Sequence, residues 1–237
     1  MTTANVAQAA ARIAGFGYLA IFVLAILANF FVLQPLGVRG DADATAANIA
    51  AAAPMYRAAV AAFMLVLIAD LIVGWALFVA FLPAGANLPL LVLIFRAAYT
   101  VAHISVVLAL LGALSFATAP ALTEGLGADA PVLAYHFFAS HGLGFTVTLI
   151  FFGVHLVLLG ALIARAGYMP RLIGWLASLA GLAYLGDGFG TILLGSYGAY
   201  AEPVTAIVII TALVGEAALM LWLIVWGVNK ARFPANA

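Results

Sequence analysis

Long runs of apolar residues alternate with short polar connections along the whole chain. A membrane core about 30 Å thick needs roughly 20 apolar residues in helical conformation, whereas membrane β-strands show only a short alternating pattern. The runs here are long and unbroken, so they predict an all-α integral membrane bundle of six transmembrane helices. The predicted spans are residues 13–33, 56–81, 88–116, 133–164, 172–195 and 204–229, and we expect one transmembrane domain over residues 1–237.

Proline and glycine mark the connections between these spans. Two connections, residues 34–55 and 117–132, are long enough to hold short helices along the membrane surface. Asp43, which precedes an alanine-rich stretch, and Thr123-Glu124, which follow Pro120, are typical of helix starts. Both connections are predicted to lie in the outer loops, on the same side of the membrane.

The composition excludes a soluble domain. Hydrophobic residues make up 68% of the chain and charged residues 7%, against roughly 45–50% and about 25% in soluble domains. The formal net charge is zero, and without a basic patch we expect no nucleic-acid partner. The chain has no cysteine, which excludes disulfides, cysteine-ligated metal sites and a cysteine nucleophile.

The distribution of cations predicts the orientation. Basic residues are retained on the cytoplasmic side of a membrane. An even number of spans places both termini on one side, and that side carries five cations against two opposite. The five are Arg12, Arg165, Arg171, Lys230 and Arg232, and the two are Arg39 and Arg57. We therefore expect a bacterial cytoplasmic (inner) membrane protein with its N- and C-termini in the cytoplasm.

Ionisable residues inside the predicted spans are the main functional signal. An Asp or Arg at the centre of a bilayer costs at least about 2.5–3.5 kcal/mol, so such residues face the bundle interior and find partners. Six such residues occur, and they are Asp70, Arg96, His103, His155, Asp187 and Glu216. At about 1.5 Å per helical residue, all six lie in one slab of the membrane, about 12–22 Å from the cytoplasmic ends of their spans.

Asp70 and Arg96 are predicted to form an ion pair. Spans two and three are joined by a tight turn, and this hairpin register sets Asp70 level with Tyr99, one helical turn from Arg96. Neighbours of opposite sign in a hairpin neutralise one another, so a structural pair is favoured over a functional one.

The remaining polar residues of the slab are candidates for handling a ligand or a proton. They are His155, Asp187, Glu216, His103 and Tyr99. Three acids face one arginine in the slab, which favours protonated carboxylates or a bound cation. For His103 and His155, a hydrogen-bonded core position, a proton relay and a metal or haem site all stay open, but their depths differ by about 8 Å, awkward for two ligands of one iron. No metal site or cofactor is predicted.

A stretch from residue 151 to residue 189 resembles a known family. The run Phe151-Phe152-Gly153-Val154-His155 is followed by Gly160, Arg165, Gly167-Tyr168-Met169-Pro170-Arg171, Gly174, Ala180-Gly181, Tyr184 and Asp187-Gly188-Phe189; Ala11-Arg12-Ile13-Ala14-Gly15 and Ala44-Thr45-Ala46-Ala47-Asn48-Ile49 extend the similarity. This pattern is similar to the bacterial membrane family catalogued as domain of unknown function 4386. The family pattern favours serine after the aspartate, where this chain has Gly188. The resemblance implies a multi-pass bacterial membrane protein and no established activity.

The chain contains no standard catalytic motif, which argues against an enzyme without excluding one. The buried polar layer favours a transporter, a protein that binds or transports a small or lipophilic solute with proton coupling. An intramembrane metal- or haem-dependent enzyme and a non-catalytic scaffold subunit are the alternatives. Because the chain is short and shows no clear inverted repeat, we expect transport to require a homo-oligomer in the lipid bilayer.

Overall fold

The computed structural model describes residues 2–195, 197–199 and 201–233, and all regular structure in this part of the chain is helical. Six helices are long and apolar enough to cross a membrane, as the apolar runs predict. They are α1 (Thr3–Ile26), which continues through η1 (Leu27–Leu33) and α2 (Gln34–Leu36), α4 (Ala53–Phe81), α5 (Asn87–Thr118), α7 (Asp129–Ala166), α8 (Arg171–Leu193) and α9 (Ala201–Val225).

The first and last helices differ most from their predicted limits. Helix α1 begins at Thr3 rather than at residue 13, because the preceding residues are rich in alanine, the strongest helix former, and bury Ala7 and Ala10. Helix α9 ends at Val225 rather than at residue 229. Gly227 follows with a φ of 66°, a left-handed conformation that ends helices and that glycine adopts without strain.

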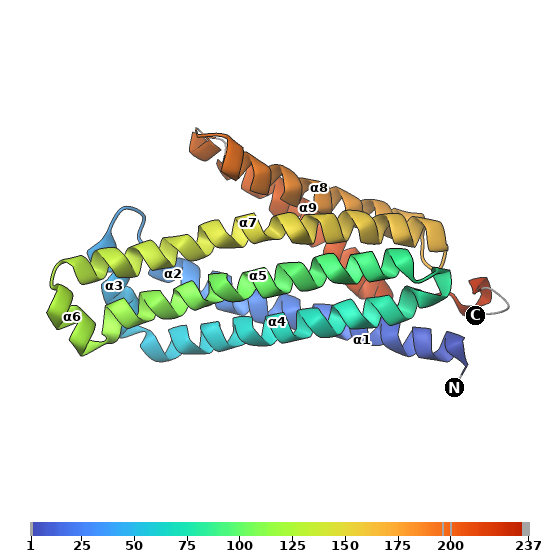
Figure 1. Cartoon of the computed structure of the whole chain (residues 1–237), viewed down its shortest axis with the longest axis horizontal. Helices are drawn as coiled ribbons and strands as arrows, with labels where there is room; N and C mark the ends of the chain where they lie inside the picture. Colours follow the sequence, from blue (N-terminus) through green and yellow to red (C-terminus); the bar gives the residue numbers. More distant parts are fainter. Residues whose placement is uncertain (1, 196, 200, 234–237) are drawn as a thin grey trace. The chain divides into compact units, whose positions relative to one another are not determined.

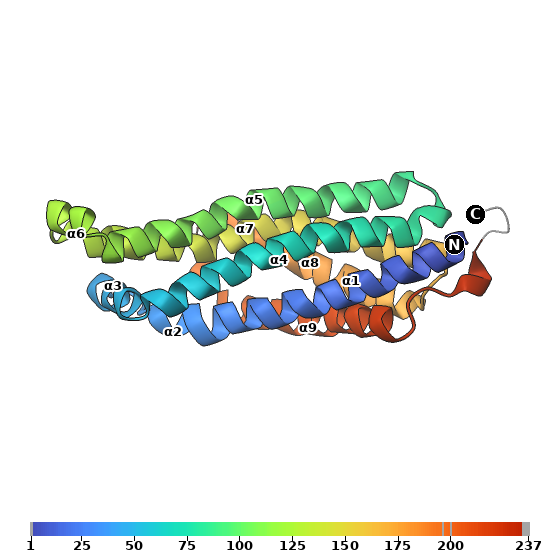
Figure 2. The ribbon, with the colours of Figure 1, turned by 90° about the horizontal axis from the view of Figure 1, so that it is seen from below.

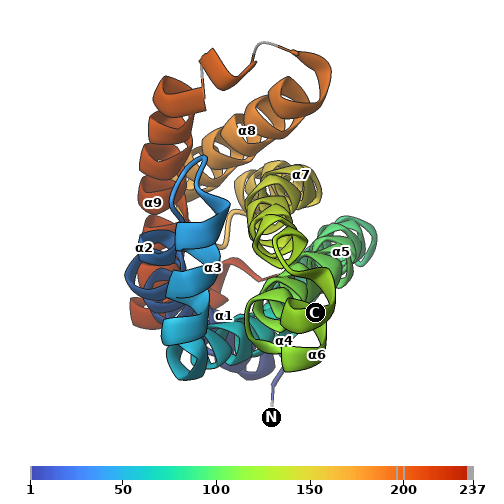
Figure 3. The same ribbon diagram turned by 90° about the vertical axis from the view of Figure 1, so that its left-hand side faces the viewer.

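Short helices occupy both long connections, as predicted. They are α3 (Ala42–Ala51), which lies beside α2 (Figure 3), and α6 (Pro120–Leu126), which joins the ends of α5 and α7 (Figure 1). Their starts differ from the prediction. Asp41 rather than Asp43 caps α3, since its Oδ1 accepts a hydrogen bond from the Ala44 N–H at 2.9 Å. Helix α6 begins at Pro120 itself, which suits a position that needs no hydrogen-bonding N–H.

The chain forms two compact units. The first unit comprises Met1–Leu19, Ala69–Thr100 and Thr146–Ala237. In it α8 and α9 lie side by side (Figure 1), and the beginning of α1 runs along α9 (Figure 2). The Gln8 side chain donates to the Trp226 carbonyl and that of Arg12 to the Val225 carbonyl, both at 3.0 Å. These bonds fasten α1 to the C-terminal end of α9.

Glycines bring α7 and α8 into backbone contact within the first unit. A Cβ added at Gly181 would lie 2.6 Å from the Gly153 carbonyl oxygen, and one at Gly174 would lie 2.6 Å from the Gly160 carbonyl oxygen. Gly153 and Gly160 are seven residues apart on α7, and Gly174 and Gly181 are seven residues apart on α8. The contact therefore repeats on one face of each helix. Small residues at such spacing allow membrane helices to approach closely.

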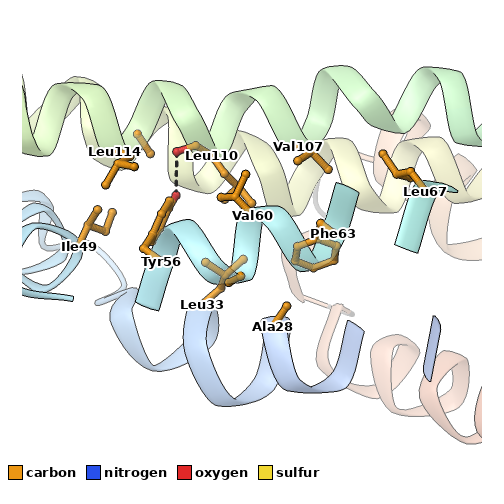
Figure 4. Close-up of a cluster of buried hydrophobic side chains, with 12 residues drawn as sticks. Ala28, Leu33, Ile49, Tyr56, Val60, Phe63, Leu67, Val107, Leu110 and Leu114 are labelled. Carbon is orange, nitrogen blue, oxygen red and sulfur yellow. Dashed lines mark hydrogen bonds between the residues drawn. The ribbon is translucent and has the colours of Figure 1, made fainter. Parts of the chain in front are cut away.

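The second unit comprises Ala20–Ile68 and Val101–Phe145. Its core is an apolar cluster drawn in Figure 4, contributed by η1, α3, α4 and α5. The buried Tyr56 hydroxyl donates to the Leu110 carbonyl at 3.0 Å, which satisfies the one polar atom of that side chain.

Candidate functional site

Arg96 is the centre of a buried polar network in the first unit. It lies on α5 with 1% of its surface exposed, and its Nη2 forms an ion pair with the carboxylate of Asp70 on α4. Its Nε donates to the Asp70 carbonyl at 2.9 Å. The short turn between α4 and α5 sets this register, so the two side chains whose pairing the hairpin predicts lie in contact.

The terminal nitrogen Nη1 of Arg96 contacts two other helices. Nη1 donates to the Tyr18 hydroxyl on α1 at 2.8 Å and lies 3.2 Å from Nε2 of His155 on α7. The rings of Tyr18 and Phe152 lie 4.8 and 5.3 Å from the Arg96 Cζ, within the range of cation–π attraction. Arg96 therefore connects four helices.

The partners of His155 define its tautomer. Its Nδ1 lies 2.9 Å from the carbonyl oxygen of Val92, which can only accept, so Nδ1 carries the hydrogen. Its Nε2 then accepts from the Arg96 guanidinium, which can only donate. A neutral imidazole satisfies both contacts, and its ring stacks on Phe152 at 5.4 Å. His155 is fully buried and acts here as a hydrogen-bonded core residue.

Glu216 is attached to the edge of this network. It lies on α9 with 8% exposure, and its Oε1 accepts a hydrogen bond from the Tyr184 hydroxyl on α8 at 2.8 Å. The Tyr184 ring packs against Phe152 at 5.8 Å. Within the described residues the Asp70–Arg96 contact is the one ion pair, so no basic side chain lies at ion-pair distance from Glu216.

Tyr99 lies beside the network on α5. Its ring packs against Phe152 at 5.0 Å, and 6% of the residue is exposed. The ring of Phe152 is thus shared by four neighbours, which are Tyr99, His155, Tyr184 and Arg96.

Among the described residues the hydrogen-bond partner of Asp187 is neither His155 nor Glu216, the two other polar candidates of the slab. Asp187 is half-buried near the C-terminal end of α8 and accepts a hydrogen bond from the Tyr197 hydroxyl at 2.7 Å. Tyr197 belongs to η3 (Tyr197–Ala199) in the connection to α9, outside the spans. Burial and the bond to Asp187 raise the pKa of Tyr197 to about 12. A Cβ at Gly190 would meet the Tyr197 ring at 2.6 Å, so this glycine makes room for the ring against α8.

His103 belongs to the second unit, although it shares α5 with Arg96. It is buried, and its ring meets the edge of Phe145 with centroids 5.0 Å apart. In the described part of the chain no three His, Asp or Glu side chains are grouped as they would be around a metal ion.

Apart from Tyr99, sequence reasoning did not identify the aromatic members of the site. Tyr18, Phe152 and Tyr184 provide two hydroxyl partners and a shared ring, and the Tyr197 hydroxyl donates to Asp187. Tyr18 and Tyr184 lie inside apolar spans, where a phenol needs a polar partner. That position is the signal which could have identified them.

Comparison with known proteins places the chain in a family. The pattern of the family described as Domain of unknown function (DUF4386) matches residues 13–227. An uncharacterized protein of Archaeoglobus fulgidus is 32% identical over 123 residues, which cover 52% of this chain and 60% of that protein. The chain thus spans less than two thirds of this relative. No solved structure matches the chain.

Proposed function

This chain belongs to the DUF4386 family, and we propose that it is a membrane protein which binds or transports a small or lipophilic solute and couples this to proton transfer at Glu216. The observation that carries the proposal is the contrast between the two buried acids of the first unit. Asp70 is neutralised by Arg96, whereas Glu216 accepts a hydrogen bond from the Tyr184 hydroxyl and has no cation at ion-pair distance among the described residues.

This contrast assigns different chemistry to the two carboxyl groups. Protonation of Asp70 would leave the buried guanidinium of Arg96 without its counter-ion, which is costly in a low-dielectric interior. Glu216 can take up a proton without leaving any cation unpaired. The Tyr184 hydroxyl can donate to its ionised form and accept from its protonated form. Intramembrane carboxyl groups of this kind are typical of proton-coupled transporters.

The Arg96 network supports the site, but its hydrogen bonds are not the ones that we expect to be exchanged when a solute binds. Four of the five guanidinium hydrogens are directed at protein acceptors, so a solute would have to displace a protein partner to bind Arg96. Tyr184 and Glu216 lie on the neighbouring helices α8 and α9, where exchange of a single hydrogen bond would admit a polar group of the solute.

We place the protein in the bacterial cytoplasmic membrane, in contact with lipid and with both termini in the cytoplasm. The cation bias supports this orientation. The N-terminal end of α1 and the segment after α9 are also tied together, since Lys230 Nζ donates to the Asn5 side chain at 2.8 Å. We further propose that transport uses a homo-oligomer, which mass photometry of the protein in lipid nanodiscs can measure.

Dicyclohexylcarbodiimide, an apolar reagent for protonated carboxyl groups, provides the first test. It adds to a carboxylic acid and rearranges to a stable N-acylurea that mass spectrometry locates. We expect modification of Glu216 that falls as the pH is raised, no modification of Asp70, and loss of the signal in Glu216→Gln. Failure of Glu216 to react at any pH between about 5 and 9, with the protein folded, contradicts the proposal.

Native mass spectrometry of protein released from nanodiscs provides the second test. We expect a co-purifying small molecule in the wild type that is lost in Glu216→Gln and kept in Glu124→Gln, a matched change on the exposed face of α6. A molecule retained by both variants would exclude Glu216 from the binding site. Metal analysis and an absorption spectrum of the same samples test the metal- or haem-dependent alternative.

A further inference from the structure

The second unit contains a cavity of about 370 Å³ that the function proposed above does not use. Its wall is formed by η1, α2 and the loop after α2 on one side, and by the first half of α7 on the other. The polar lining residues are Asn29, Gln34, Arg39, Tyr135 and His141. All of them can donate a hydrogen bond, one is a permanent cation, and no acid lines the cavity.

His141 is the buried member of this lining and has an unused polar atom. It is 7% exposed, and its Nε2 is the buried side-chain nitrogen or oxygen for which the described residues provide no hydrogen-bond partner. Its ring is held by aromatic neighbours, with Phe63 at 5.6 Å and Phe145 at 6.3 Å between ring centroids. Buried polar groups in native proteins are nearly always paired, so this nitrogen indicates a partner that the described residues do not supply.

The backbone of the opposite wall is irregular at the same place. Residues Leu27–Leu33 form a π-helix, in which the Gln34 N–H bonds to the Asn29 carbonyl five residues earlier. π-Helical turns are rare and occur frequently at functional sites. The π-helix is followed by the short helix α2 and then by the loop that carries Arg39, and both Asn29 and Leu33 from the π-helix line the cavity.

The loop that closes the cavity is held in place by hydrogen bonds. The Gly40 N–H donates to the Tyr135 hydroxyl at 3.0 Å, and the Val38 N–H donates to Thr45 Oγ1 at 2.9 Å. The Tyr135 hydroxyl still has its own hydrogen to donate. The cavity is thus preformed, which lowers the entropic cost of binding.

We propose that this cavity binds a small carboxylate with an apolar, ring-sized body. The Arg39 guanidinium and the Tyr135 hydroxyl supply donors for the anionic head, since guanidinium–carboxylate pairing is a strong charge-assisted contact. Phe138 and Phe145 form an apolar wall for the body, and His141 supplies a buried hydrogen bond to the carboxylate. The cavity residues belong to the second unit and Glu216 to the first, so either proposal can fail without the other.

Three probes of nearly equal shape and different charge test the proposal. They are 1-naphthoate, 1-naphthalenemethanol and 1-naphthylmethylammonium, titrated at neutral pH into the full-length protein in phosphatidylcholine nanodiscs, with empty nanodiscs as the reference for partition into lipid. We expect saturable binding of 1-naphthoate that is at least about tenfold tighter than binding of the other two. Equal binding of all three probes, or preference for the ammonium, overturns the proposal.

Matched variants locate the binding. Arg39→Gln is expected to weaken binding of 1-naphthoate about tenfold, whereas Arg57→Gln, an exposed arginine in the same unit, leaves it unchanged. His141→Phe is expected to weaken it, and His136→Phe, on the exposed part of the same helix, is not. An Arg39→Gln variant that binds as the wild type does overturns the assignment.

Gly142→Leu tests the cavity in a variant that is expected to fold, so that loss of binding cannot be caused by unfolding. Gly142 lines the cavity, and a Cβ added there would meet nothing within 4 Å. The leucine is therefore accommodated by the chain while its side chain reduces the free volume. We expect an unchanged melting temperature and loss of 1-naphthoate binding, and binding that persists in this folded variant contradicts a ligand in this cavity.

Discussion

At the scale of single residues, Arg96 and Asp70 are expected to stabilise one another strongly. Arg96→Met would leave Asp70 as a buried charge, a situation that costs roughly 3–5 kcal/mol, and would also remove the donor to Tyr18 and His155. Asp70→Leu would leave an arginine that keeps those two contacts, so its cost should be smaller. The double variant should recover much of the loss, because two apolar side chains replace two buried charges.

A double-mutant cycle measured by SDS or thermal unfolding of the purified protein checks this pair. The melting temperature of each single variant and of the double variant gives the coupling free energy. Additive losses would mean that the two side chains do not interact.

Tyr197 provides a pH-dependent prediction outside the spans. Its folded-state pKa of about 12 lies above the ordinary value of 10.0, so the stabilisation by its protonated form is complete below pH 10 and is lost as the pH rises from about 10 to about 12. Burial is the larger cause of the raised pKa and Asp187 the smaller. Asp187→Asn should therefore lower the pKa only part of the way toward 10.

NMR titration of ring-labelled tyrosine, assigned with Tyr197→Phe, measures this pKa. Tyr168 is the internal control, since burial raises its pKa without a carboxylate among the causes, and Asp187→Asn should leave it unchanged. If the titration midpoint of Tyr197 is the same in Asp187→Asn as in the wild type, the bond between these residues makes no contribution.

The partners of Asp70 and Asp187 show which contacts of the site can be predicted from the sequence and which cannot. The partner of Asp70 follows from the hairpin, because a turn of a few residues fixes the register of α4 against α5. The partner of Asp187 is Tyr197, ten residues later in an irregular connection, and depth along a helix contains no information about that loop. Depth also says nothing about which way a side chain faces, so a common depth of Asp187, Glu216 and His155 does not predict that each has its own partner.

At the scale of helices, apolar run length predicts the spans, and capping residues decide their ends. The π-helical turn at Leu27–Leu33 has no counterpart in the sequence pattern. Apolar periodicity is too coarse to register one extra residue in a turn. The same limit applies to the first ten residues, where alanine continues the helix with little apolar signal of its own.

The glycine contact between α7 and α8 is expected to be essential for their packing. Gly181→Ala would place a Cβ 2.6 Å from the Gly153 carbonyl oxygen, which forces the two backbones apart. Overpacking of this kind costs typically about 1–3 kcal/mol. Gly186→Ala is the matched control on the same helix, because a Cβ there meets nothing within 4 Å, and it should stabilise the helix by about 0.5–1 kcal/mol.

Thermal unfolding of the two glycine variants distinguishes a packing role from a general effect of alanine. A lower melting temperature for Gly181→Ala together with an equal or higher one for Gly186→Ala agrees with close backbone contact. Equal behaviour of the two variants would contradict it.

At the scale of the whole molecule, the orientation that we propose rests on a small imbalance of charge. Five cations lie on the side that holds the two termini and two lie on the opposite side, and basic residues in short loops stay in the cytoplasm. Contacts between Asn5 and Lys230 and between Gln8 and Trp226 keep the two ends of the first unit together. They require a common side for the termini, whichever side that is.

Single cysteines can test this orientation directly, because the chain has none of its own. Gly125→Cys lies on α6, where a Cβ meets nothing within 4 Å, and Thr3→Cys and Lys230→Cys lie near the two ends. In intact bacterial spheroplasts a membrane-impermeant maleimide should label Gly125→Cys alone, and all three after permeabilisation. Labelling of Lys230→Cys without Gly125→Cys would invert the orientation, whereas labelling at only one of the two ends would be incompatible with an even number of spans. The five-to-two imbalance favours the first outcome, because reversing the molecule would carry five basic residues across the membrane instead of two.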